Sequence, residues 1–476
     1  MQRRELPYGL ILFGLAIFLM VAVVLDKPWI GFSFPFLVIL IALVEKPILL
    51  FYAGCLTIPF SVETQLTSSL GTDIPDEPFM WLNTASVGFL IYHQRKKLGP
   101  WISHPIVVFI LLSWLWSWVS LLTAADPILS LKFILAKTWY LVPFLIGTIL
   151  LLDSRAKLGT AICCIVIPMV FLSLVTMLRQ AGSDFSFEDV SKASFPYFRN
   201  HVNYGALLAC SIPPVYYFYK RSGNQAWLFA LFLQCVALYF SYSRGAWLAL
   251  IVALFIAFIM KRKLMNGLIF FSTASVLFVS VWLLQNNRYL HYRTDYRNTI
   301  YHSALKDHME ATYTLKDLSG AERIYRWIAG WRMAKEHLTT GVGPNHFYPH
   351  YKSYTVPSFR TYVSENAEHS TVHNYFLLLL SEQGIPGLLL FLFSLISMFA
   401  TAQKIYTRSK DEQSRNIVLG VASVLGMITV LISLSDLIET DKIGPIFYIC
   451  AGVLVAASSG SYIERIPESV SEEIKR

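Results

Sequence analysis

The chain has 476 residues, of which 55% are hydrophobic and only 14% charged, and its formal net charge is +9. A soluble globular protein carries about 25% charged residues, so this composition excludes an ordinary soluble domain. Apolar windows of roughly 17 to 25 residues, the length of a bilayer-crossing helix, recur along the chain. The sequence therefore predicts an all-α polytopic membrane protein.

The apolar windows predict fourteen spans, or twelve if the short or amphipathic segments 47–60 and 127–137 do not cross. The first is an uncleaved helix, because further spans rather than a small-residue cleavage site follow its basic flank. In chain order the predicted spans are 8–25, 29–44, 47–60, 79–93, 104–122, 127–152, 158–177, 204–219, 226–240, 245–260, 264–284, 374–402, 416–435 and 442–459.

The loops between these spans differ in charge in a way that predicts their sides. Lysine and arginine gather in alternate loops, as at Arg95–Lys97, Lys261–Lys263 and 404–415, whereas loops 61–78 and 123–126 contain none. Basic residues in short loops favour the cytoplasmic side. Both termini are therefore predicted to be cytoplasmic, in a bacterial inner membrane.

The predicted domains follow from this topology. They are an N-terminal transmembrane bundle (1–284), a periplasmic loop domain (285–372), C-terminal transmembrane helices (373–460) and a cytoplasmic tail (461–476). Eight of the chain's eleven histidines lie between residues 285 and 373. Histidine and arginine enrichment outside the membrane indicates handling of anionic groups, the alternative being a merely solvated basic domain.

Within the loop domain, "SGAERIYRWIAGWRMAKEH" predicts an amphipathic helix that ends by Gly341. Ser319 and Glu322 have capping-box spacing. Helical spacing also predicts one apolar stripe, formed by Ile324, Trp327, Ile328 and Trp331. Arg323 lies in the first turn, on the border of the stripe, where it can face a cleft.

Three residues are predicted to meet at the outer face. Arg244 opens the tenth span, Arg323 lies in the loop domain, and His373 begins the twelfth span at headgroup depth. A neutral imidazole accepts a proton near its ordinary pKa of about 6 to 7, and guanidinium groups bind phosphate bidentately. Such a set suits glycosyl or phosphoryl transfer. Taken alone, Arg244 is equally an interfacial anchor, and His373 a helix-terminal hydrogen-bonding residue.

Other polar residues near the site are predicted to support it. His369 and Asn374 flank His373, and Glu382 lies deeper in the same helix, just before a kink expected at 384–387. Lys137 lies inside the sixth span or at its interface. No metal-ligand spacing occurs, so a metal site formed by His346, His350, His369 and His373 is the weaker alternative.

Three motifs carry a resemblance to a known family. "HNYFLLLLSEQGIPG" follows the pattern His-[Asn/Ser/Gln], nine residues, Gly, and "SYSRGAWLAL" contains a Ser-Arg-Gly helix start. "ERIYRWIAGWRMAKEHLTTGVGPNHF" has Arg-x-x-x-Trp leading into Gly-Val-Gly, without the usual preceding proline. In this order they resemble the O-antigen ligase and O-antigen polymerase superfamily over about residues 200–402.

The resemblance implies a GT-C-like, inverting, metal-independent transferase without a cofactor. Its donor would be a glycan on undecaprenyl diphosphate, and its acceptor a sugar hydroxyl, foremost on lipid A–core. Carried onto this chain, Arg244 and Arg323 would bind the diphosphate and His373 would activate the acceptor. The site would face the periplasm, with the phospholipid bilayer around it and no nucleic acid as a partner.

Three alternatives stay open. Polymerisation of repeat units and glycan transfer onto protein use the same chemistry as ligation. A lipid-linked glycan flippase belongs to another class, and it would need charges lining a cavity at the membrane midplane, often with internal repeats. No repeat is apparent here, and the notable charges other than Lys137 gather at one face.

Overall fold

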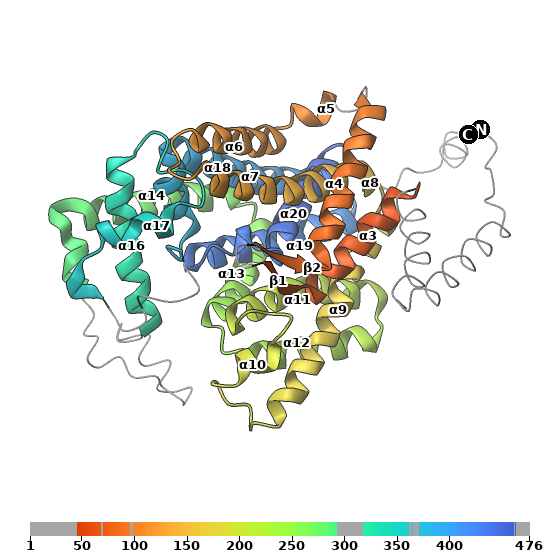
Figure 1. Ribbon diagram of the computed structural model, residues 1–476. Coiled ribbons are helices and arrows are strands. Elements are labelled where there is room, and N and C mark those ends of the chain that lie inside the picture. The colour runs from red at the N-terminus through yellow and green to blue at the C-terminus, as the bar shows by residue number, and fades with distance from the viewer. Residues whose placement is uncertain are drawn as a thin grey trace, which may run out of the picture.

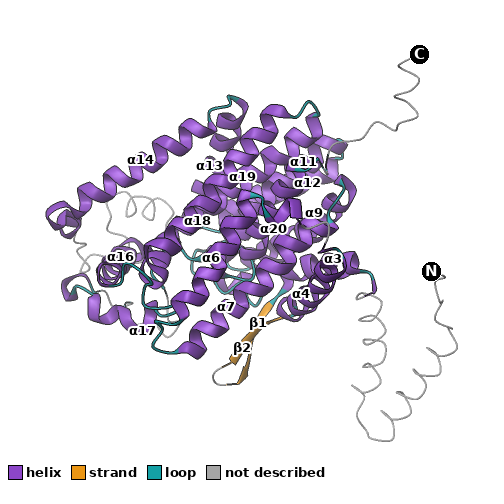
Figure 2. Ribbon diagram, turned by 90° about the horizontal axis from the view of Figure 1, so that it is seen from above, coloured by secondary structure: helices purple, strands orange, loops and turns teal. Residues whose placement is uncertain are grey.

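The computed structural model describes residues 45–67, 70–95, 99–292, 318–360, 364, 371–460 and 462. The first two predicted spans and His369 lie outside the described residues. Within them, the chain is a bundle of helices, with α6, α7, α18, α19 and α20 running side by side at its centre (Figure 1). Helices α16 and α17 lie at one end of this bundle, and α14 runs along one edge (Figure 2).

The helices in the first half are α3 (Pro47–Thr57), α4 (Asp76–His93), α5 (Gly99–Ile102), α6 (Pro105–Leu121), α7 (Pro127–Leu141), α8 (Thr148–Leu151), α9 (Arg155–Ala181), α10 (Val190–Ser194), α11 (His201–Ser222) and α12 (Gln225–Phe240). Those in the second half are α13 (Arg244–Lys261), α14 (Met265–Leu284), α16 (Leu318–Glu336), α17 (Phe347–Tyr351), α18 (Tyr375–Arg408), α19 (Glu412–Leu434) and α20 (Gly444–Ser458). A π-helical segment, η3 (Val142–Gly147), joins α7 to α8, and short 3-10 segments are η1 (Ile58–Phe60), η4 (Gln285–Tyr292), η6 (Lys352–Tyr354), η7 (Pro357–Phe359) and η8 (Leu437–Glu439).

Each predicted span from 47–60 onward coincides with a helix in the structure. By length and composition, six of the described helices can cross a membrane, and four shorter apolar helices accompany them. Their lipid-facing surfaces are rich in exposed apolar side chains, as on α14, where Phe270, Phe271 and Phe278 are exposed. The prediction of an all-α polytopic membrane protein is confirmed.

The loop predicted at 61–78 contains a β-hairpin that the sequence analysis missed. Strands β1 (Val62–Thr67) and β2 (Leu70–Ile74) pair antiparallel. The hairpin is anchored where it leaves η1, because the buried Lys442 ammonium donates to the carbonyls of Ile58 (2.8 Å) and Ser61 (3.0 Å). A short hairpin with several polar residues gives no apolar window, which is why the sequence analysis missed it.

The two ends of the bundle each bring together distant parts of the chain. At one end, Arg155 pairs with Asp411, donates to Gln413 (2.9 Å) and donates to the carbonyl of Tyr462 (2.6 Å). At the other end, the Asn374 side chain donates to the carbonyl of Ser433 (3.1 Å). The charge pattern predicts that residues 155, 411, 413 and 462 all lie on the cytoplasmic side, and that residues 374 and 433 both lie near the periplasmic side. The contacts within each end of the bundle are consistent with that prediction.

The predicted orientation can be tested with two exposed lysines. We expect Lys192→Cys, between α9 and α11, to react with a membrane-impermeant maleimide on intact spheroplasts. Lys410→Cys, between α18 and α19, should react only after the membrane is disrupted. Cys235 is exposed on the lipid-facing side of α12, so the unaltered protein serves as the background control. The reverse labelling order would invert the topology.

The amphipathic helix α16 differs in detail from the expectation. It already includes Leu318, so Ser319 is not its N-cap, and the predicted capping box is wrong. The Glu322 carboxylate instead accepts from Arg326. The apolar side chains buried on α16 include Ile328 of the predicted stripe, and the others are Ala321, Tyr325, Ala329, Met333 and Ala334.

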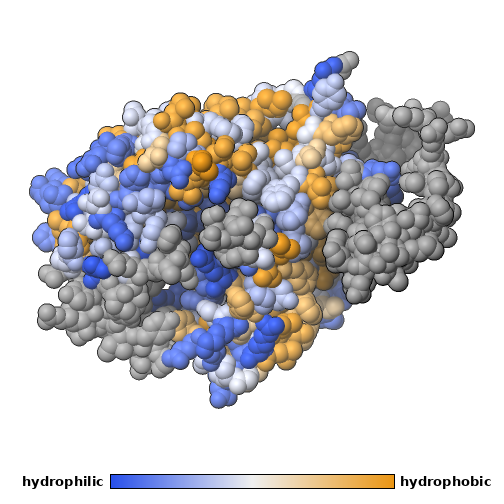
Figure 3. All heavy atoms as spheres, in the orientation of Figure 1, coloured by the Kyte–Doolittle hydropathy of each residue, from blue (hydrophilic) through white to orange (hydrophobic). Residues whose placement is uncertain are grey.

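Helix α16 packs on the start of α18. A Cβ at Gly330 would lie 2.9 Å from Val372, which shows how close the two segments approach. Hydrophilic residues gather at this end of the molecule, over α16 and α17, while hydrophobic residues cover much of α6 (Figure 3). A polar cap thus lies against the beginning of α18, where the candidate site was predicted.

Candidate active site

His373 stands directly before α18 in a conformation that is rare for its residue type. Its φ is +53°, in the left-handed region that side chains with a Cβ seldom adopt. Asn374 is the N-cap: its side-chain oxygen accepts from the Leu377 N–H (3.0 Å) while its amide donates to Ser433 (3.1 Å). Non-glycine residues held at positive φ are frequent at functional sites. The cap therefore fixes His373 against the end of α19.

A buried arginine, which the sequence analysis did not select, holds the segment before His373. Arg326 is fully buried, and its guanidinium donates to Glu322 (3.1 Å), to the carbonyl of Thr371 (3.2 Å) and to the carbonyl of Ser364 (3.4 Å). The Arg326 guanidinium is thus bound by other groups of the protein. Its bond to the Thr371 carbonyl fixes the backbone two residues before His373. The Glu-x-x-x-Arg spacing at 322–326 is the sequence signal that would have found it.

The surroundings of His373 keep its imidazole neutral. Burial and then the positive charges of Arg326 and Arg323 lower the pKa of His373 to about 3. Within the described residues, its ring nitrogens have no hydrogen-bond partner, and only its backbone N–H is engaged, with the Thr371 hydroxyl (3.5 Å). A neutral imidazole with an accessible nitrogen is the form that can accept a proton from a hydroxyl group.

The two predicted diphosphate-binding arginines lie on different helices, and of the two only Arg323 is shown to act on His373. Arg323 is partly buried on α16, three residues before Arg326, and its charge acts on His373. Arg244 is the first residue of α13 and is also partly buried. A Cβ at the next residue, Gly245, would lie 3.3 Å from Leu434, beside the residue that Asn374 binds. The start of α13 and the start of α18 therefore flank the same end of α19.

Deeper in α18, the predicted kink is present and receives a loop. Gly384 interrupts the helix with φ +69° and ψ −169°. A Cβ there would lie 2.2 Å from the carbonyl oxygen of Thr339, and one at Gly341 would lie 2.1 Å from the Glu382 backbone. Only glycine permits this approach, so "TTGVG" and "SEQG" meet backbone to backbone.

Glu382 ties this loop, residues 338–347, to α18. Its buried carboxylate accepts from the N–H groups of Asn345 (2.8 Å) and Phe347 (2.8 Å). The Glu382 and Ser381 carbonyls accept from Gly343 (2.9 Å) and Val342 (3.1 Å). These bonds connect the outer loop domain to the helix that His373 precedes, so Glu382 contacts protein backbone at this position.

We expect Glu382→Gln to destabilise the protein, because an amide replaces one acceptor with a donor that faces a backbone N–H. An unsatisfied buried donor costs about 1 to 3 kcal/mol. The thermal unfolding temperature in detergent should fall well below that of Glu412→Gln, an exposed residue at the start of α19 that serves as the control. Equal unfolding temperatures would show that these two bonds do not hold the loop.

Lys137 lies in the bundle interior rather than beside the arginines. Its buried ammonium is 3.3 Å from the hydroxyl of the buried Tyr375 and 3.7 Å from the carboxylate of the partly buried Glu439. Tyr375 is the first residue of α18, and Glu439 belongs to η8, after α19. Through these two contacts, Lys137 connects α7 to η8 and to the start of α18, two residues after His373. Nothing in the sequence analysis pointed to Glu439 as its partner.

His346, one of the histidines considered for a metal site, has both ring nitrogens occupied. Nε2 accepts from the Asp126 N–H (2.9 Å), and Nδ1 lies 2.9 Å from the carbonyl of Pro344. The ring thus bridges the 338–347 loop and the start of α7. With both nitrogens engaged by backbone groups, His346 has a structural role in this arrangement.

Comparison with known families finds a match over this region of the chain. A sequence model of the family described as O-antigen ligase matches residues 229–392. The chain carries an O-antigen ligase-like domain. This domain runs from α12 into α18 and includes Arg244, Arg323, His373, Asn374 and Glu382, whereas Lys137 lies outside it. No curated protein matches the chain.

The match covers residues 229–392 only, so the similarity to O-antigen ligases concerns this part of the chain. Among the described residues, six helices are long and apolar enough to cross a membrane, which agrees with a membrane protein of this kind. The O-antigen ligase-like domain contributes the start of α13, the whole of α16 and the start of α18. The first two elements carry Arg244 and Arg323, and His373 stands just before the third.

Proposed function

We propose that the protein transfers a glycan from undecaprenyl diphosphate to a sugar hydroxyl at the periplasmic face of the bacterial inner membrane. The observation that carries this proposal is the position of His373. Its imidazole is neutral, its backbone has a positive φ, and the arginines of α16 act on its charge. It also stands next to the end of α19, which the start of α13 flanks as well. His373, the arginines of α16 and the start of α13 lie in the O-antigen ligase-like domain, whereas α19 follows it in the chain.

In the proposed reaction, His373 accepts the proton of the acceptor hydroxyl as that oxygen attacks the anomeric carbon. The new glycosidic bond forms on the face opposite the leaving diphosphate, so the configuration inverts. The bond from the anomeric carbon to the diphosphate oxygen breaks, and its electron pair leaves with undecaprenyl diphosphate. The proton on His373 then passes to solvent. Each step uses groups of this chain and its two substrates, without a cofactor.

Arg244 and Arg323 bind the diphosphate in this proposal. A guanidinium keeps its charge and offers two parallel donors, which match two phosphate oxygens. Negative charge on the bridging oxygen grows as the bond breaks, so these donors stabilise the transition state more than the ground state. Arg326 is engaged by Glu322 and backbone carbonyls, and we assign it the positioning of His373.

We propose ligation of O-antigen to lipid A–core as the principal reaction, with repeat-unit polymerisation or transfer to protein as the alternative. A lipid-linked glycan flippase is the alternative of another class. In a Gram-negative strain lacking this protein, ligation predicts free lipid A–core together with accumulated long lipid-linked chains. Polymerisation predicts core capped with a single repeat. Lipid-linked repeats retained on the cytoplasmic face would identify a flippase and contradict transfer.

A further inference from the structure

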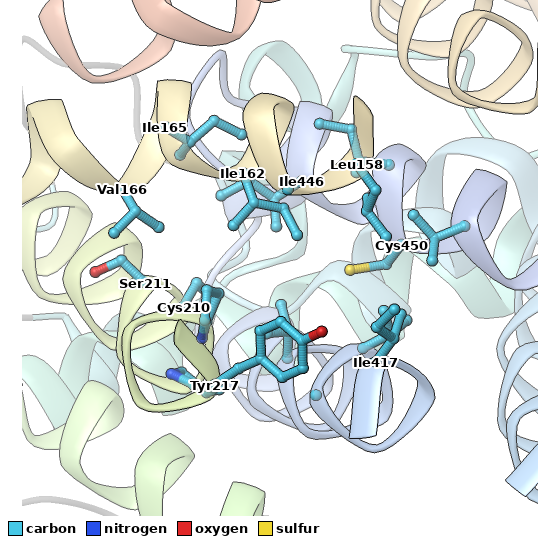
Figure 4. A pocket seen from close by; sticks show the side chains of 18 of the residues that line it. Leu158, Ile162, Ile165, Val166, Cys210, Ser211, Tyr217, Ile417, Ile446 and Cys450 are labelled. Atoms are coloured by element: carbon cyan, nitrogen blue, oxygen red, sulfur yellow. The ribbon is translucent and has the colours of Figure 1, made fainter. Parts of the chain in front are cut away.

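A pocket lies at the end of the bundle away from His373. It has a volume of about 110 Å³, is partly open to its surroundings, and is bounded by residues of α9, α11, α19 and α20 (Figure 4). Its walls are mostly apolar, from Leu158, Ile162, Ile165, Ile417, Ile449 and Val453 among others. Arg155 and Arg221 stand at its rim. Because Arg155 and Arg221 lie at the ends of α9 and α11, the rim is on the predicted cytoplasmic side.

The sequence keeps this space open. Pro213 and Pro214 lie inside α11 and remove two backbone donors from its hydrogen-bond ladder, which bends a helix away from its neighbours. Two further wall residues are glycines, Gly159 on α9 and Gly420 on α19, and a Cβ at either would meet no atom within 4 Å. These prolines and glycines therefore leave space in the pocket that a bound molecule can occupy.

The hydroxyl oxygen of Tyr217 indicates that the pocket binds a molecule with a hydrogen-bond acceptor. Within the described residues, the Tyr217 hydroxyl is buried and has no hydrogen-bond partner. Figure 4 shows its ring reaching into the pocket between Cys210 and Ile417. A buried hydroxyl without a partner is costly, so a bound molecule with an acceptor near this point would satisfy it. An ester carbonyl between an apolar chain and a charged headgroup is such an acceptor.

The rim supplies the complementary charge. Arg221 is exposed at the end of α11, next to the exposed Lys220. Arg155 is already committed to Asp411, Gln413 and the Tyr462 carbonyl, so Arg221 is the cation that can meet an added anion. The cytoplasmic leaflet is negatively charged, and basic residues at its surface attract its anionic headgroups.

We propose that this pocket binds the first part of one acyl chain of an anionic phospholipid from the cytoplasmic leaflet, with its phosphate at Arg221 and its ester near Tyr217. The site differs from the glycan-transfer site in position, leaflet and chemistry. It requires no covalent step. A lipid held here would brace α11 against α19, whose other end adjoins His373.

The acyl-chain part is tested with the full chain in nanodiscs that contain phosphatidylglycerol carrying a photoreactive group in one acyl tail. We expect cross-links to map to the pocket residues of α9, α11 and α20. Gly159→Leu and Gly420→Leu fill the space and should each reduce these cross-links about tenfold, as expected when two methylene groups are excluded. Gly88→Leu and Gly267→Leu, whose Cβ positions are equally open but lie outside the pocket, are the matched controls.

The headgroup part is tested in the same nanodiscs. Arg221→Gln should weaken labelling by phosphatidylglycerol about fivefold, while Lys220→Gln, beside it but outside the pocket, should change it little. Equal labelling by photoreactive phosphatidylcholine, or equal yields in all four glycine variants, would overturn the proposal. Competition by a polyprenyl phosphate but not by excess phosphatidylglycerol would also overturn it, because the guest would then be an isoprenoid lipid.

Discussion

Replacing His373 with glycine is expected to reduce glycan transfer by about 10²- to 10⁴-fold while leaving the protein folded. Loss of a general base typically has this effect. Glycine suits the test because His373 holds φ at +53°, a conformation that glycine adopts freely and alanine does not. The strain is thus removed together with the ring. Transfer is measured with purified protein, a lipid-linked donor and a glycan acceptor.

The control for this variant is Asn345→Gly. Asn345 also has positive φ (+61°), lies in the loop that docks on α18, and contributes only its backbone N–H to Glu382. It should keep near-normal transfer. Added imidazole should partly restore His373→Gly, since the ring's space is then empty. A fully active His373→Gly protein would remove His373 from the chemistry and leave it as a helix-terminal residue.

The pH dependence should differ from that of an ordinary histidine. Because burial and Arg326 lower the pKa of His373 to about 3 in the free protein, the imidazole stays unprotonated well below neutral pH. We therefore expect kcat/KM to be level down to about pH 5 and to fall only below it, since kcat/KM follows the free enzyme. The negative charge of a bound diphosphate raises the pKa of His373. The fall of kcat on the acid side should therefore begin at a higher pH than the fall of kcat/KM. A limb in kcat/KM at pH 6 to 7, the range the sequence predicted, would contradict this electrostatic account.

The second large effect is expected at the two predicted diphosphate-binding arginines. Arg244→Lys and Arg323→Lys keep the charge but lose the planar fork, and each should lower kcat/KM by about ten- to a hundredfold, with the alanine variants lower still. Loss of a charged hydrogen bond costs about 1.5 to 3 kcal/mol, which gives this range. Transfer rates at several donor concentrations separate the loss of binding from the loss of turnover.

Matched controls lie on the same helices. Arg262 ends α13 at its opposite end, where it stacks on Phe258. Arg332 lies further along α16, with its guanidinium 3.5 Å from the carbonyl of Tyr354. Lysine at either position should leave kcat/KM within about twofold of the wild-type value, because neither approaches His373. If the control and test substitutions had equal effects, the arginines would act through stability or membrane anchoring.

The sequence predicted the helices and the kink because both depend on local signals. Apolar length marks each span, and Gly384 followed by Pro386 marks the break in α18. The first residues of α13 and α18 were also identifiable, since a charged residue at the start of an apolar run stands out against its neighbours. The residue roles proposed for Arg244, Arg323 and His373 stay predictions until the variants are measured.

The contacts that hold the site were not readable from the sequence, because each joins distant segments. Arg326 is one of many arginines until Thr371 is known to lie beside it. Lys137 and Glu439 are about three hundred residues apart in the chain, and the buried carboxylate of Glu382 finds its donors in another loop. The hairpin β1–β2 was missed for a related reason, since its polar residues give no hydropathy pattern.

The most direct measurement is a single-turnover assay with the purified full chain in proteoliposomes, supplied with a glycan on undecaprenyl diphosphate and with lipid A–core. The account predicts one undecaprenyl diphosphate released for each glycan transferred, an inverted anomeric configuration in the product, and transfer by His373→Gly slowed by about 10²- to 10⁴-fold. Transfer without release of undecaprenyl diphosphate, retention of configuration, or unchanged turnover by His373→Gly would contradict it.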